Sequence, residues 1–309
     1  MKHKPEPAAS GYFHNRRLFL QSITTLAAGQ LLLPLTGNAA AFFTRMKPVT
    51  VGDIMDQMIA AVPGPRLTET VDTLKSGSRD KEVKGIVVTM FATVDVIRKT
   101  IAAGANFIIA HEPTFYNHPD ETNWLKDDAV YQYKAKLLKD NDITVWRFHD
   151  YIHSIEPDPV TVSVNAQLGW TPYADKSLPN SLQIPTIPLK DLIQHLKSKL
   201  GIEKVRYIGD PAQLCSRILI MPGAAGKEKH IAGISKLHPD VLICGEISEW
   251  ETAEYVRDAR AEGDPIALIV LGHIASEDPG STWVLNWLKD HYPQIPAKHI
   301  HPGNSLSFL

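Results

Sequence analysis

Six short apolar runs, separated by amphipathic segments, constrain the fold of this 309-residue chain more than any other feature. Each run is rich in β-branched residues and bounded by turn residues, as strands covered on both faces are. The expected strands are Lys84–Met90, Asn106–Glu112, Ile143–His149, Ser216–Pro222, Asp240–Glu246 and Ile266–Gly272. The expected helices are Val51–Val62, Thr93–Ala103, Asp127–Lys139, Leu189–Leu200, Glu249–Ala261 and Ser281–Lys289. This alternation predicts an α/β protein with layered sheets and crossover helices.

A proline-containing span, Asn180–Asp191, separates two halves of similar length. Its Pro185 and Pro188 indicate a linker or a crossover between domains. We therefore expect two layered α/β domains with mixed sheets, at residues 46–180 and 181–309.

The first 41 residues have the composition of an export signal. Basic residues precede a modest apolar run, Glu6 is the only acid before Asp53, and small residues follow the run as a peptidase would require. The stretch "NRRLFLQ", Asn15–Gln21, resembles the twin-arginine motif, whose substrates cross the membrane already folded. We expect residues 1–41 to be a twin-arginine signal peptide and the mature protein to be periplasmic or otherwise extracytoplasmic. The alternative is an uncleaved anchor or a disordered tail, although polar residues inside the run weaken a membrane span.

Composition excludes several classes of protein. The formal net charge is −2, and removing the signal, with four basic residues and one acid, makes the chain more acidic, which argues against nucleic-acid binding. No later apolar stretch is long enough to span a bilayer. Cys215 and Cys244 are the only cysteines, so no thiolate cluster can hold a metal. They could form a disulfide in an exported protein, but both flank strand-like runs, which favours buried free thiols.

Three of the expected strands end in groups that can bind a metal or move a proton. These groups are His111 and Glu112 after the second strand, His149, Asp150 and His153 after the third, and His273 and Glu277 after the last. Ligands of open α/β sheets bind beyond the carboxyl ends of the strands. A single histidine at a strand end is most often a loop cap or a hydrogen-bonded core residue, but three such ends favour one shared site between strand ends.

The chemistry of these groups favours a metal centre over an acid/base pair. The chain offers more ligands than a pair needs, and no nucleophilic Ser or Cys motif accompanies them. Imidazoles and carboxylates suit Zn²⁺, Mn²⁺, Fe and Ni, whereas the lack of thiolates disfavours a closed structural zinc site. Two ions require a bridging carboxylate, which Glu112 or Glu277 could supply. We therefore expect two divalent metal ions per chain.

Four short motifs, taken together and in their order along the chain, indicate a resemblance to a known family. They are "AHEP" (Ala110–Pro113), "HDYIH" (His149–His153), "GEISEWE" (Gly245–Glu251) and "GHIASEDPG" (Gly272–Gly280). With them the chain resembles the Nif-three-like dinuclear-metal family, whose members are often described as GTP cyclohydrolase 1 type 2. The resemblance covers most of the chain after the signal. It implies a set of five metal ligands: His111, Glu112, His153, His273 and Glu277.

Two features depart from the family pattern. The family has a second histidine where this chain has Glu112 and an aspartate where it has His153, so an imidazole and an acid have exchanged places. Because an imidazole does not bridge two metals as a carboxylate does, Glu277 becomes the expected bridge. The early "DNVGL" segment of the family is also absent, and Val71–Gly77 stands in its place.

The resemblance and the ligands together favour a metal-dependent hydrolase that acts on a small polar or nucleotide-like substrate. His149 or Glu249 is the expected proton-transfer group, although Glu246 and Glu249 could equally be solvated acids at a helix N-terminus. Export argues against GTP as the substrate. The alternative is a non-catalytic metal-binding protein for assembly or storage, because the resemblance implies a ring-shaped homo-oligomer, often a hexamer.

Overall fold

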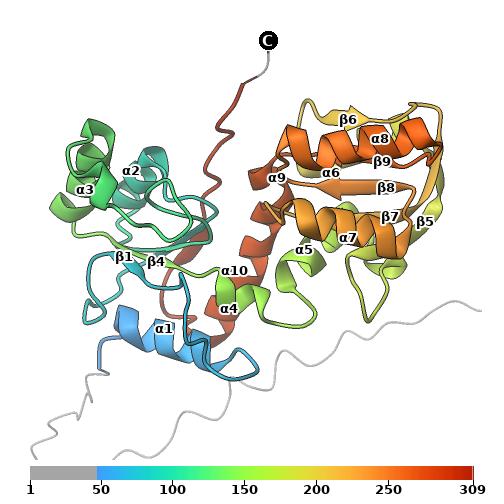
Figure 1. Ribbon diagram of the computed structural model, residues 1–309. Helices are drawn as coiled ribbons and strands as arrows, with labels where there is room; N and C mark the ends of the chain where they lie inside the picture. Colours follow the sequence, from blue (N-terminus) through green and yellow to red (C-terminus); the bar gives the residue numbers. More distant parts are fainter. Residues whose placement is uncertain (1–46, 308) are drawn as a thin grey trace, which may run out of the picture. The chain divides into compact units, whose positions relative to one another are not determined.

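Ten strands form two five-stranded sheets in the residues that the computed structural model describes, 47–307 and 309 (Figure 1). The first sheet has the order β1-β4-β3-β2-β10 and consists of β1 (Leu74–Ser76), β2 (Ile86–Thr89), β3 (Phe107–Ala110), β4 (Thr144–Arg147) and β10 (Ala297–His299). The second has the order β5-β7-β8-β9-β6 and consists of β5 (Ser181–Pro188), β6 (Arg206–Ile208), β7 (Leu214–Met221), β8 (Val241–Cys244) and β9 (Ala267–Val270). The prediction of an α/β fold with mixed sheets is confirmed.

The register of the first sheet brings the ends of its strands together. β2, β3 and β4 are parallel, and Thr89, Ala110 and Arg147 lie side by side in the last rung. β10 extends the parallel set beside β2, whereas β1 runs antiparallel to β4. The segments that follow Ala110 and Arg147 therefore leave the sheet at the same edge.

The second sheet is built on the same plan. β7, β8 and β9 are parallel, with Met221, Cys244 and Val270 at equivalent levels, and the edge strands β5 and β6 are antiparallel to their neighbours. The residues that follow these three parallel strands share one edge of the sheet.

Helices cover both faces of each sheet. The principal helices are α1 (Val51–Ala60), α2 (Val94–Ala102), α3 (Ala129–Asp140), α4 (Asp150–His153), α5 (Pro159–Leu168), α6 (Leu189–Leu200), α7 (Lys227–Leu237), α8 (Glu254–Glu262), α9 (His273–Glu277) and α10 (Ser281–His291). Shorter helical turns are η1 (Asn123–Leu125), η2 (Thr171–Tyr173), η3 (Glu249–Ala253) and η4 (Asp278–Gly280).

Alternate residues of each strand enter different cores, which explains why the strands read as continuous apolar runs. In β3, Ile109 packs in a core with α1 and α10, and Ile108 packs in a core with α2 and α3. In β8, Ile243 packs in a core with α5 and α6, and Leu242 packs in a core with α7 and α8. A strand whose side chains are buried on both faces has no polar alternation.

The six expected strands and the six expected helices are present in the structure, with ends that differ by a few residues, and η3 and α8 share the helix expected at Glu249–Ala261. Of the two interpretations of Asn180–Asp191, the linker is wrong, because Ser181–Pro188 forms edge strand β5 and α6 begins at Leu189. The crossover between domains stays a prediction. Prolines are tolerated at a sheet edge, where a missing N–H breaks no inner ladder.

The last part of the chain returns to the first sheet. α10 contributes Val284 and Trp287 to the core of that sheet, and β10 pairs with β2. The division into domains at residues 46–180 and 181–309 stays a prediction. α10 and β10 belong to the second of these ranges but pack with elements of the first.

Cys215 and Cys244 are buried free thiols, as expected. Burial raises the pKa of the Cys215 thiol to about 11 and that of Cys244 to about 12. Within the described residues, no helix combines the length and the apolar character that a membrane crossing requires. The expected signal peptide, residues 1–41, lies outside the described part of the chain.

Candidate metal centre

The ladder of the first sheet continues past β3 and fixes the first two candidate ligands. The His111 N–H donates to the Thr89 carbonyl at 3.0 Å, and the Glu112 N–H donates to the Met90 carbonyl at 2.8 Å. The fully buried Arg147 at the end of β4 donates to the His111 carbonyl at 3.1 Å and to Glu112 Oε2 at 3.4 Å. The backbone around this pair is therefore held on both sides.

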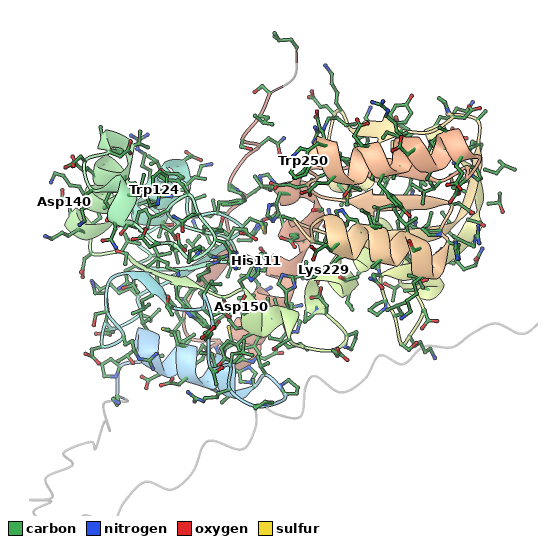
Figure 2. All side chains as sticks on the ribbon, viewed as in Figure 1. His111, Trp124, Asp140, Asp150, Lys229 and Trp250 are labelled. Carbon is green, nitrogen blue, oxygen red and sulfur yellow. The ribbon has the colours of Figure 1, made fainter. Side chains whose placement is uncertain are left out.

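A buried aspartate positions the next two histidines. Asp72 accepts the N–H groups of His149, Asp150 and Tyr151 at 2.8, 2.9 and 2.9 Å. The first N–H groups of a helix, here α4, have no partner within the helix, so a carboxylate that accepts from them stabilises the helix. His149 and His153 consequently stand one helical turn apart beyond the end of β4. Figure 2 labels Asp150, the first residue of α4.

The last pair comes from the second sheet. After β9 the chain turns at Gly272, which has a φ of 97°, and enters α9, where His273 and Glu277 lie one turn apart on one face. Gly223, after β7, has a φ of 66°, and a Cβ at this position would overlap the Glu277 carboxylate. The glycine thus leaves the space that the Glu277 carboxylate occupies.

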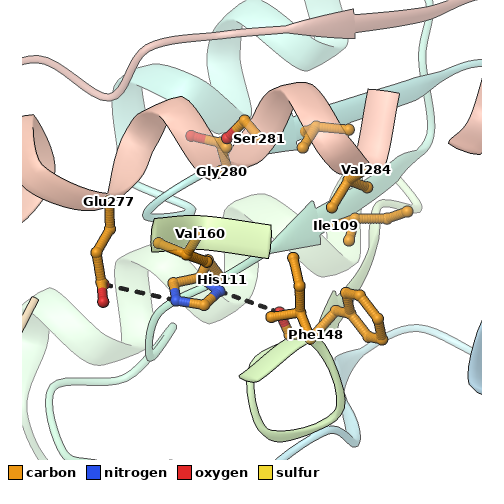
Figure 3. Close-up of a pocket in the computed structure, with 11 residues that line it drawn as sticks. Ile109, His111, Phe148, Val160, Glu277, Gly280, Ser281 and Val284 are labelled. Carbon is orange, nitrogen blue, oxygen red and sulfur yellow. Dashed lines mark hydrogen bonds and ion pairs between the residues drawn. The ribbon is translucent and has the colours of Figure 1, made fainter. Parts of the chain in front are cut away.

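Side chains from the three strand ends meet in one cluster. His111 Nε2 lies 3.2 Å from His153 Nε2. It also lies 3.5 Å from Glu277 Oε2, a contact drawn as a dashed line in Figure 3. His273 Nε2 lies 2.9 Å from Glu277 Oε2 and 3.2 Å from Glu112 Oε1. The structure therefore brings together all five residues for which the sequence predicts a metal-binding role.

The histidines share one orientation. Each directs Nδ1 to an oxygen outside the cluster and Nε2 toward it. The outer partners are the Phe148 carbonyl for His111 at 3.2 Å, Asp150 for His149 at 2.8 Å, Asp158 for His153 at 3.5 Å and Glu246 for His273 at 3.1 Å. The contacts of His111, His149 and His273 are hydrogen bonds, whereas that of His153 is a longer contact. Metal-binding histidines characteristically hydrogen-bond their second nitrogen, which fixes the tautomer and the ring direction.

The electrostatics of the cluster favour a cation at its centre. Burial lowers the pKa of His273, but hydrogen bonds to Glu112, Glu246 and Glu277 outweigh burial and raise the pKa to about 12. Burial raises the pKa of Glu277, but His111 and His273 outweigh that effect and hold the pKa well below its usual range. The carboxylates thus draw a positive charge to the cluster, which a proton on His273 or a divalent cation can provide.

His149 differs from its neighbours. Burial and the positive charge of His111 lower the pKa of His149 to about 4, so its imidazole is neutral at pH 7. Its Nε2 lies 3.7 Å from Glu112 Oε1. His149 forms a compact group of candidate ligands with His111 and His153, and a second such group consists of His111, Glu112 and Glu277.

Glu249 stands apart in its contacts. Its carboxylate is largely exposed and pairs with Arg206 at 2.7 Å, whereas Glu246 contacts His273. A role for Glu249 in proton transfer stays a prediction that no contact with the cluster supports. Neither Asp72 nor Arg147 was predicted from the sequence, although Asp72 lies in the segment that replaces the family's "DNVGL".

The donor set fits divalent transition metals. Four imidazoles present Nε2 and two buried carboxylates present oxygens to one centre, without thiolates, which suits Zn²⁺, Mn²⁺, Fe and Ni. The Glu277 carboxylate lies between histidines of the two sheets. Its Oε2 lies 2.9 Å from His273 Nε2, and its Oε1 lies 3.9 Å from His153 Nε2. In contrast, Glu112 uses one oxygen for Arg147.

Fold and site together define an α/β protein with two mixed sheets and a candidate metal-binding cluster at the strand ends. Residues 49–301 match the Duf34/NIF3 (NGG1p interacting factor 3) family, and the chain belongs to this family. It is 26% identical over 216 residues to a GTP cyclohydrolase 1 type 2 homolog of Clostridium perfringens (strain 13 / Type A), a match that covers 67% of this chain and 78% of that protein.

Solved structures share the fold of this chain. A hypothetical protein of Staphylococcus aureus superposes with a TM-score of 0.67 at 20% identity, covering 85% of this chain and 99% of the other. A Bacillus cereus protein related to NIF3 gives a TM-score of 0.66 at 14% identity, with the same coverage. At these identities the likeness concerns the fold.

Proposed function

We propose that this protein is a metal-dependent hydrolase that acts on a small polar or nucleotide-like substrate with two divalent ions per chain. The observation that carries the proposal is the convergence of imidazole Nε2 atoms and two buried carboxylates, with an oxygen outside the cluster near each Nδ1. Bound ions would polarise the electrophile and lower the pKa of water. The residues that would hold them are His111, Glu112, His153, His273 and Glu277.

A cavity beside the cluster supports a small-molecule substrate. Its volume is about 1280 Å³, and Glu112 and His273 line it together with Glu246 and Lys134. This exceeds the roughly 300–1,000 Å³ of ordinary ligand pockets, so it has room for a nucleotide-sized compound. The name of the Clostridium relative, a GTP cyclohydrolase 1 type 2 homolog, is consistent with that size of substrate.

Lys134 favours an anionic group on the substrate. Its ammonium is buried, donates to the Thr114 carbonyl at 2.5 Å and lies 5.7 and 5.3 Å from the ring centroids of Phe115 and Tyr116. Burial lowers its pKa to about 8, which leaves it mostly charged at pH 7. A buried cation without a carboxylate contact in the described residues would stabilise a phosphate or carboxylate in the cavity.

Hydrolysis of a panel of phosphoesters, amides and nucleotides by the purified, metal-loaded protein tests this function. Glu277→Gln removes the charge of the expected bridge at nearly constant volume and should abolish turnover, while Lys134→Met should raise KM mainly for anionic substrates. Glu254→Gln, at an exposed acid paired with Arg257, is the matched control. Metal binding without turnover across the panel would instead favour a non-catalytic metal-binding or storage protein.

We further propose that the protein acts outside the cytoplasm as a homo-oligomer. Support comes from the arginine pair at residues 16 and 17 and from the family resemblance, which implies a ring, often a hexamer. Light scattering of the eluted protein measures its mass in solution, and a monomeric mass would contradict the oligomer.

A further inference from the structure

The cluster has two sides with different chemistry, and His111 contacts both, since its Nε2 also lies 3.5 Å from Glu277 Oε2. The rings of His111, His149 and His153 lie with centroids 4.8 to 5.0 Å apart. On the other side, Glu112 and Glu277 meet at His273 Nε2, at 3.2 and 2.9 Å. One side therefore offers imidazoles and the other offers mostly carboxylates.

The hydrogen bonds of His149 are those of a metal-binding histidine. Its Nδ1 lies 2.8 Å from Asp150 Oδ1, and Asp150 Oδ2 is fixed by the Thr70 hydroxyl and the Val71 N–H, each at 2.9 Å. Asp72 holds the His149 backbone. A ring anchored through Nδ1 by a carboxylate that is itself anchored has only Nε2 left for the cluster, which is the carboxylate–histidine–metal arrangement.

On the carboxylate side, Arg147 engages one of the two oxygens of Glu112. Its guanidinium lies 3.4 Å from Glu112 Oε2 and leaves Oε1 to face His273, His149 and the centre. Glu277 reaches the histidine side through its second oxygen, 3.9 Å from His153 Nε2. Glu277 can thus connect two positions whose remaining ligands differ.

We propose that His149 is a metal ligand and that the two metal positions differ: His111, His149 and His153 form a three-imidazole position, and Glu112, Glu277 and His273 form a carboxylate-rich position. This inference rests on the proposed function. Imidazoles favour Zn²⁺ and Ni²⁺, whereas carboxylates favour Mn²⁺ and Mg²⁺. The centre should therefore accept two different ions, one at each position.

The ligand role is tested with His149→Asn. Asparagine can keep the donor to Asp150 but supplies no atom in place of Nε2. After zinc loading and dialysis, bound zinc should fall from two ions to one per chain, and X-ray absorption should show fewer imidazoles per zinc. His238→Asn is the matched control, because His238 caps α7 with a φ of 45°, a conformation that asparagine accepts.

The outcomes separate the inference from the proposed function. If His149 only orients a neighbour, His149→Asn should keep two zinc ions, weaken affinity by only about 10–100-fold and leave the imidazole count unchanged, and this result would overturn the inference alone. A wild-type protein without bound metal would overturn both. Neither readout depends on turnover.

The difference between the positions is tested by adding one equivalent each of Zn²⁺ and Mn²⁺ to the metal-free wild-type protein. Native mass spectrometry should show chains that carry one ion of each kind as the main species. A random mixture of zinc pairs, manganese pairs and mixed pairs would contradict distinct positions.

Discussion

At the scale of single residues, the orientation of the imidazoles decides what the cluster can do. The Nδ1 atoms of His111, His149, His153 and His273 are engaged by oxygens outside it, so the Nε2 atoms face one another and two carboxylates. A histidine with a purely structural role needs only the contact between its Nδ1 atom and an oxygen outside the cluster. Four rings that leave the inner nitrogen to the same centre indicate a site arranged for a cation.

The protonation of His273 predicts how metal binding depends on pH. Its pKa of about 12 means that His273 carries a proton at pH 7 before a metal binds. A metal ligand must be a neutral imidazole, so binding must release that proton, and affinity should rise as the pH rises from 6 to 9. Titration calorimetry in two buffers of different ionisation enthalpy should detect release of at least one proton per chain. An enthalpy that is the same in both buffers would contradict this protonation state.

At the scale of elements, glycines at the ends of the parallel strands create the space for the ligands. Gly223 after β7 lies against Glu277, and a Cβ at Gly245 after β8 would overlap Ser276, which precedes Glu277 on α9. The close approach of these turns to α9 places a buried carboxylate beside the histidines of the first sheet.

Gly223→Ala should displace Glu277 and weaken metal binding. Gly169→Ala is the matched control, because Gly169 also has a positive φ, 73°, but open space around its Cβ position. The control should lose about 1–2 kcal/mol of stability from the left-handed backbone alone and keep its metals. Chemical denaturation and zinc retention measure the two effects. Equal zinc retention in both variants would show that the space at Gly223 is not needed.

Much of this arrangement was predictable from the sequence, because strands buried on both faces produce continuous apolar runs that end at their ligands. His111 with Glu112 and His273 with Glu277 are of this kind. Edge strands were not predictable: Ser181–Pro188 contains prolines that suggested a linker, yet at a sheet edge they cost no inner hydrogen bond. Asp72 was also missed, because its role depends on a contact with α4, which is 77 to 79 residues away in the sequence.

At the scale of the whole molecule, residues far apart in the sequence build one site. β3 and α4 contribute from the first sheet and α9 from the second, and α10 then returns to the core of the first sheet. A site assembled from both sheets depends on the packing of the whole described unit, Lys47–Leu309. Metal binding should consequently stabilise the folded state as a whole.

Export concerns the chain before this unit. Replacing Arg16 and Arg17 by Lys preserves the charge of the leader but removes the arginine pair of the motif. The precursor should then accumulate in the cytoplasm, which fractionation followed by immunoblotting measures. Unchanged export of the double variant would contradict the twin-arginine route.

The central claim is that the cluster binds two divalent transition-metal ions per chain. The most direct test is the ratio of metal ions to protein chains. Elemental analysis and an exact protein concentration give this ratio for protein purified from its own compartment without added metal or chelator. About two ions per chain are expected, and fewer in Glu277→Gln, because Glu277 places one oxygen near His273 and the other near His153. Protein that contains no transition metal and takes up none on reconstitution would contradict it.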